Sequence, residues 1–146
     1  MEIKHHTLLA VIAITAFSSA PAWADDNTPV VQQQNGISYV SGGVGDEETA
    51  ALEATKQNYD LRIMNADKTG HFNGNSHIVI RDAKNAVLVD AASGPLFYAN
   101  LPDGHYVVEG SHLDESKKQT VTISSNKPVR IRFIWQHHAA EVTNNK

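Results

Sequence analysis

From residue 58 onward, apolar and polar side chains alternate with a period of two. In the last such run, Ile131, Phe133 and Trp135 fall on one side of an extended chain, and Arg130 and Arg132 on the other. Turn-forming residues interrupt the alternation about every eight to twelve residues. This pattern predicts about seven short antiparallel strands with one face in a core and one toward water. We therefore expect an all-β fold, an antiparallel β-sandwich over residues 58–136.

The inward-facing positions carry enough aliphatic and aromatic side chains to form a core between two sheets. They are Leu61, Ile63, Ile78, Ile80, Val87, Val89, Phe97, Tyr106, Val108, Val121, Ile123, Ile131 and Phe133. Residues 94–109 contain two alternating runs separated by Pro102, Asp103 and Gly104. Because these three residue types favour tight turns, the segment is predicted to be a β-hairpin.

The part of the chain before the sandwich has a different character. Residues 25–57 comprise a polar arm, a glycine-rich loop over 41–48 and a short predicted helix from Thr49 to Gln57. Asp46 is a suitable N-cap, and Glu47 and Glu48 stand where the helix dipole favours negative charge. After the sandwich, residues 137–146 form a polar C-terminal tail.

The first 24 residues have the three parts of a secretory signal peptide. A weakly basic start precedes an uncharged apolar run from Leu8 to Phe17, and Ala22-Trp23-Ala24 is an A-x-A cleavage site. The apolar run is about half the length that a membrane-spanning helix needs. Cleavage after Ala24 would release a mature chain without a membrane span, located in the periplasm or secreted.

The composition and charge of the chain limit the classes of partner that we expect. The formal net charge is −4, and no cysteine is present, so no disulfide supports the fold. Lysine and arginine are scattered along the sequence without a basic cluster, so nucleic acid is not an expected partner.

The order of the segments resembles the carboxypeptidase regulatory-like domain, which has a transthyretin-like (prealbumin-like) β-sandwich. The similarity covers about residues 58–135 and is carried by Ile78–Lys84, Phe97 and Leu101–Val108, which contains Leu-Pro-x-Gly-x-Tyr. Tyr39–Glu48 also resembles a segment of small exported bacterial proteins. The resemblance implies a folding, spacing or binding module and not a catalyst. Some transthyretin-like proteins hydrolyse a purine breakdown product, but their C-terminal Tyr-Arg-Gly-Ser is missing here.

Two groups of residues are candidates for a site, although no nucleophile motif is present. Histidine binds Cu²⁺ and Zn²⁺, so one hypothesis is a metal site; the alternative is that these surface histidines share no ligand. The candidate metal ligands are His77, His105, His112, His137 and His138. The candidate partner-binding residues are Asp46, Glu47, Glu48 and Tyr98. The alternatives for this second group are a helix cap with solvated charges and, for Tyr98, cover by the predicted helix.

These observations favour a non-catalytic exported module, not an enzyme, that binds a protein or envelope component and needs no cofactor. A periplasmic metal-binding protein is the first alternative. The second is a carbohydrate-binding module in which Tyr98 and Trp135 stack on sugar rings. Arg130 and Arg132 are interpreted as structural residues that pair with Glu109 across the sheet.

Overall fold

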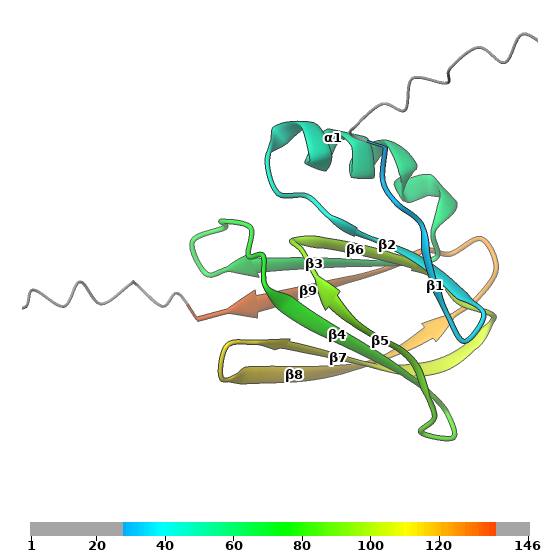
Figure 1. Ribbon diagram of the computed structural model, residues 1–146. Helices are drawn as coiled ribbons and strands as arrows, with labels where there is room; N and C mark the ends of the chain where they lie inside the picture. The colour runs from blue at the N-terminus through cyan, green and yellow to red at the C-terminus, as the bar shows by residue number, and fades with distance from the viewer. Residues whose placement is uncertain (1–27, 137–146) are drawn as a thin grey trace, which may run out of the picture.

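Two β-sheets pack face to face in the computed structural model, which describes residues 28–136 (Figure 1). The five-stranded sheet has the order β1 (Gln32–Gln34), β2 (Ile37–Gly42), β6 (Leu96–Asn100), β3 (Leu61–Asp67) and β9 (Val129–Trp135). The four-stranded sheet has the order β5 (Val87–Ser93), β4 (Ser76–Asp82), β7 (Gly104–His112) and β8 (Glu115–Ile123). The predicted signal peptide and C-terminal tail lie outside the described residues.

The predicted all-β sandwich is confirmed, with two differences in its strands. Strands β3 to β9 occupy the seven predicted segments, but β1 and β2 come from the region interpreted as an arm and loop. The sandwich therefore begins well before residue 58. All pairings are antiparallel except that of β3 with β9, which is parallel and joins Ile63 to Ile131 in register. Within residues 28–136, no helix is long and apolar enough to cross a membrane.

The core lies between the sheets and contains every predicted core residue except Val87, whose side chain is 39% exposed. The reason is a β-bulge. Ile80 pairs with Val89, but the next residue, Arg81, pairs with Val87, so Leu88 is an extra residue on β5. Because side chains alternate between faces, one extra residue turns Val87 to the solvent face.

The turn at Pro102 does not form the predicted hairpin. It carries the chain from β6 in one sheet to β7 in the other, and these two strands do not pair (Figure 1). The Tyr106 hydroxyl donates a hydrogen bond of 2.6 Å to the carbonyl oxygen of Pro102. A tyrosine that ties its own strand back to the preceding turn is the tyrosine corner of Greek-key sandwiches. It fixes the direction in which the chain enters the second sheet.

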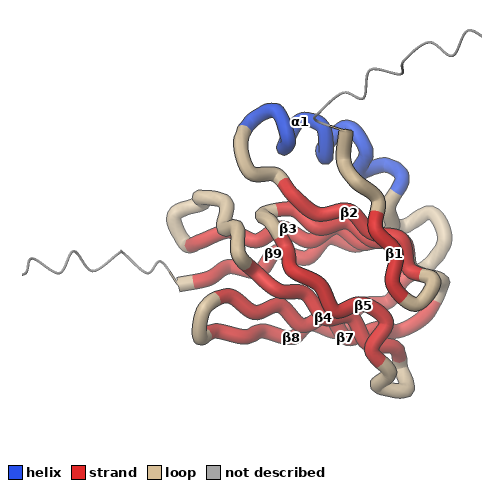
Figure 2. Tube along the Cα trace, viewed as in Figure 1, coloured by secondary structure: helices blue, strands red, loops and turns tan. Residues whose placement is uncertain are grey.

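A helix covers the outer face of the five-stranded sheet (Figure 2). Helix α1 (Asp46–Thr55), followed by the short 3₁₀ turn η1 (Lys56–Asn58), starts three residues earlier than predicted, and its N-cap is Gly45 instead of Asp46. Leu52 is its buried residue and packs in a second apolar cluster with Val40, Tyr59, Leu96 and Tyr98. This packing stabilises a helix too short and too weakly amphipathic to form alone.

We predict that Tyr106→Phe destabilises the protein by about 1 kcal/mol, because it deletes one hydroxyl hydrogen bond and little volume. Urea unfolding measures the loss. Tyr59→Phe is the matched control, since the Tyr59 hydroxyl makes no hydrogen bond within the described residues. Equal losses for the two variants would show that the Tyr106–Pro102 bond contributes nothing.

Candidate functional site: a cationic groove beside the helix

The structure separates the predicted metal ligands. His77 Nε2 lies 2.5 Å from Asp90 Oδ1 on the neighbouring strand, and His105 Nδ1 lies 2.9 Å from Thr122 Oγ1. His77 is in register with Ser111 on β7. His105 therefore lies six positions away from it, about 20 Å along the strand.

His112 is directed to the other face of the sheet from His77. It is in register with Ser76, and its ring lies 5.8 Å from the ring of Trp135. The described residues contain no group of three side chains suited to hold a metal ion. The structure therefore does not bring His77, His105 and His112 together. His137 and His138 lie outside the described residues.

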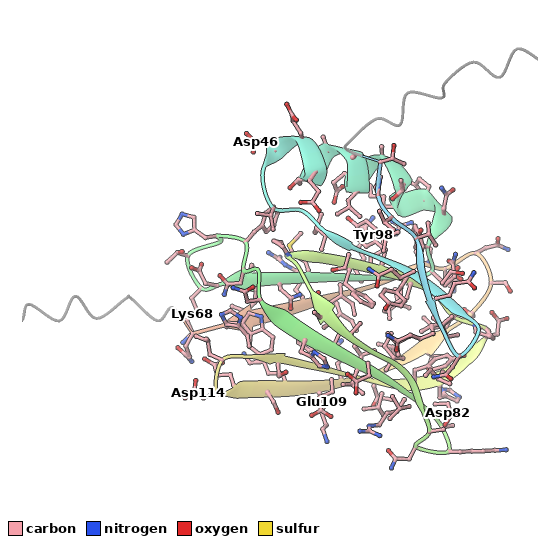
Figure 3. All side chains as sticks on the ribbon, viewed as in Figure 1. Asp46, Lys68, Asp82, Tyr98, Glu109 and Asp114 are labelled. Carbon is pink, nitrogen blue, oxygen red and sulfur yellow. The ribbon has the colours of Figure 1, made fainter. Side chains whose placement is uncertain are left out.

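The acidic residues of the glycine-rich loop occupy the first turn of α1. Glu48 Oε2 accepts a hydrogen bond of 3.0 Å from the backbone N–H of Val44, which closes the loop onto the helix. Asp46 and Glu47 are exposed, and Figure 3 shows Asp46 at the end of the helix. The placement of all three carboxylates is that of a helix start, where the dipole favours negative charge.

Tyr98 is not an exposed contact residue. Its side chain is 3% exposed beneath α1 (Figure 3), and its hydroxyl donates a hydrogen bond of 2.7 Å to Glu53 Oε1. Burial, reinforced by this bond to a carboxylate, raises the pKa of Tyr98 above its usual range. Trp135 is 0% exposed, and its Nε1 donates to Asn65 Oδ1 at 3.3 Å. Neither ring offers a free face, so the prediction of a sugar-stacking platform is wrong.

Sequence reasoning missed a groove of about 260 Å³ on the outer face of the five-stranded sheet, between α1 and β9. Its floor contains the side chains of Met64, Leu96 and Tyr98. Its charged residues come from four elements and comprise four cations and one carboxylate. They are Glu53 on α1, Lys56 on η1, Arg62 on β3, and Arg130 and Arg132 on β9. On a chain of net charge −4, this is a local concentration of positive charge.

Like charges stand side by side in this groove. Arg62 and Arg130 are register partners on adjacent parallel strands, so their side chains leave the sheet on the same face. Arg62 is only 7% exposed, and its Nε donates to the carbonyl oxygen of Tyr59 at 3.3 Å. Like charges directly opposite each other destabilise a sheet. An anion placed between the two guanidinium groups would offset this repulsion.

The one carboxylate that lines the groove already accepts hydrogen bonds from neighbouring side chains. Glu53 accepts hydrogen bonds from Lys56 Nζ at 2.5 Å and from the Tyr98 hydroxyl. The bond from Lys56 foremost, and that from Tyr98, hold the pKa of Glu53 below its ordinary value of 4.5, so it is ionised at neutral pH.

The two β9 arginines are left without a carboxylate. Arg130 and Arg132 make no ion pair with any residue of the described part of the chain. The expected pair with Glu109 is wrong, because Glu109 lies on β7 in the other sheet and binds Lys118 at 3.4 Å. Figure 3 shows Glu109 on the four-stranded layer, away from the helix. Guanidinium groups bind carboxylate and phosphate oxygens in a bidentate manner. The groove is therefore suited to hold an anionic group above an apolar floor.

Comparison with known proteins adds little to this geometry. No family model and no curated protein matches the sequence. Among solved structures, the chain is similar to the TIE protein of Bacillus anthracis, with 17% sequence identity and a TM-score of 0.40. The similar region covers 52% of this chain and 16% of that one. A likeness at this level carries no argument about function.

We predict that Arg130→Glu raises the free energy of unfolding by about 0.2–1 kcal/mol, because it replaces a like-charge pair with Arg62 by an opposite-charge pair. Chemical denaturation at low ionic strength measures the change. Arg132→Glu is the matched control, since its register partner is the uncharged Met64, and we expect a smaller gain. A loss of stability in Arg130→Glu alone would mean that Arg130 is a structural residue.

Proposed function

We propose that this chain is an exported, non-catalytic binding or accessory module, and that its cationic groove holds an acidic group of a protein or envelope partner. The observation that carries the proposal is the in-register pair of Arg62 and Arg130. Arg132 lies next to this pair, and no carboxylate among the described residues lines the β9 side of the groove. A rigid sandwich supports these residues, since both arginine-bearing strands have their inner faces in the core.

Three further points support this proposal. Three of the four cations that line the groove are arginines, whose guanidinium groups bind carboxylate and phosphate oxygens in a bidentate manner. The resemblance to the carboxypeptidase regulatory-like domain implies a binding module. The N-terminal sequence has the pattern of a secretory signal peptide, which favours a partner outside the cytoplasm.

Export is tested by the N-terminus of the protein purified from its native host. We predict that the mature chain begins at Asp25, because Ala22-Trp23-Ala24 has the small-residue pattern of a cleavage site. Cell fractionation followed by intact-mass measurement checks the compartment and the start together. The matched control is Ala24→Arg, which should block cleavage and retain the longer form. A full-length chain recovered from the cytoplasm would contradict the proposal.

Partner binding is tested by photo-cross-linking in intact cells of the native host. A photoreactive amino acid replaces Gln57, which is exposed in η1 next to Lys56 and leaves the groove cations intact. We predict a discrete adduct, reduced at least tenfold by Arg130→Glu/Arg132→Glu, because charge reversal repels an acidic partner. Lys84 in the β4–β5 turn is the control position and should give no such adduct. An adduct unchanged by charge reversal would reject the groove as the binding site.

A further inference from the structure

No strand of residues 28–136 pairs with the outer edge of β9, beside the groove. The backbone N–H of Val129 donates to the carbonyl oxygen of Asp60 at 2.7 Å, on the side of β3. Because backbone groups of successive residues point to opposite sides of a strand, those of Arg130 and Arg132 point away from the sheet. No hydrogen bond joins them to another described residue. The strand is therefore unpaired at the two positions that carry the groove arginines.

Side chains close the rest of this edge and one edge of the other sheet. The carbonyl oxygen of Ile134 accepts a hydrogen bond from the Lys117 ammonium, and the N–H of Gln136 donates to Glu115 Oε1 at 2.9 Å. On the opposite side of the sandwich, the amide of Gln34 bonds both the N–H and the carbonyl oxygen of Asp90 on β5. Such devices protect strand edges from unwanted pairing. On β9, Arg130 and Arg132 are thus the residues whose outward N–H and carbonyl groups both have no bonded partner among the described residues.

We infer that the groove recognises an extended acidic segment of a partner protein, which adds to β9 as a further strand. This inference deepens the proposed function and rests on it. The partner backbone would pair with Arg130 and Arg132, and its carboxylates, at every second position, would lie on the same face as the three arginines. Backbone pairing supplies affinity, and the alternating charges fix register and face.

The positive charge along β9 favours an acidic segment over a second copy of the chain as the strand that pairs there. Two β9 edges that paired with each other would bring their arginines together on one face, and like charges opposite each other are unfavourable. An acidic strand instead relieves the repulsion between Arg62 and Arg130.

The test uses a capped nine-residue peptide of alternating glutamate and threonine, and two isomers of it. One isomer is N-methylated at two glutamates and the other at two threonines. In an antiparallel strand opposite Arg130 and Arg132, the glutamate N–H groups face β9. We expect the threonine-methylated isomer to keep the affinity of the parent and the glutamate-methylated isomer to lose at least tenfold. The opposite preference would support strand addition in the parallel sense, and equal affinities would overturn strand addition.

Amide exchange followed by NMR on the mature chain supplies the second readout. We expect the N–H groups of Arg130 and Arg132 to exchange rapidly in the free protein and at least tenfold more slowly when the parent peptide is bound. Protection in the free protein would overturn the inference, because it would mean that another segment or a second copy already covers the edge. Sedimentation of the free protein then distinguishes these two occupants.

Protein variants separate this inference from the proposed function. Arg130→Gln/Arg132→Gln should weaken the parent peptide at least tenfold, whereas Lys68→Gln/Lys84→Gln, with the same change in net charge, should not. If the arginine variant weakens binding but the methylated isomers bind equally, the groove binds anions without strand addition and only this inference fails. If no peptide binds at millimolar concentration, strand addition is rejected, and the cross-linking result decides the proposed function alone.

Discussion

The parallel pairing of β3 with β9 is the constraint on which the rest of the structure depends. It joins the first and last of the seven strands predicted from the alternation, which lie 68 residues apart at Arg62 and Arg130, and so adds β9 as the edge strand of the five-stranded sheet. At its far end it sets Trp135 opposite Asp67, where the indole reaches Asn65. The same register puts Arg130 beside Arg62. The core and the groove therefore follow from one pairing, and a slip of one residue would bury an arginine while exposing Ile131.

Helix α1 converts one face of this sheet from a solvent face into a second packed layer. Gly42 allows the close approach, because a Cβ there would lie 3.1 Å from a methyl group of Leu52 and in contact with the Glu48 carboxylate. Leu52 then covers part of β2 and β6. The helix stops short of β9, so the two arginines of that strand remain exposed next to a buried floor. The groove is the boundary between the covered and uncovered parts of one sheet face.

Alternation predicted strands β3 to β9 and nearly all of the core, because a period of two depends only on neighbouring residues. The alternation did not predict the structural features that depend on residues distant in the sequence. The residues of the β4–β5 turn are the same whether or not β5 has a bulge at Leu88. The residues around Pro102 are likewise the same whether the chain changes sheet there or forms a hairpin. Tyr98 sits at an outer-face position and is buried only because α1 returns over it. Similarly, histidine identity alone did not reveal that the β4–β7 register places His105 six positions from the residue opposite His77. The groove needs the β3–β9 register, and its only trace in the sequence is the outward pair Arg130 and Arg132.

The chain has a negative net charge and the groove a positive local charge, and this contrast determines at what distance the groove attracts a partner. The chain as a whole is negative, so an acidic partner is not attracted over long distances, and screening limits long-range fields to about 10 Å at 0.1 M salt. Attraction therefore acts at contact, where Arg62 is already removed from water and held by the carbonyl oxygen of Tyr59. A guanidinium fixed in this way loses little further freedom or hydration on binding, so an anion that fits gains more from it than from a mobile surface lysine. The arrangement favours selectivity among acidic ligands over rapid capture of any of them.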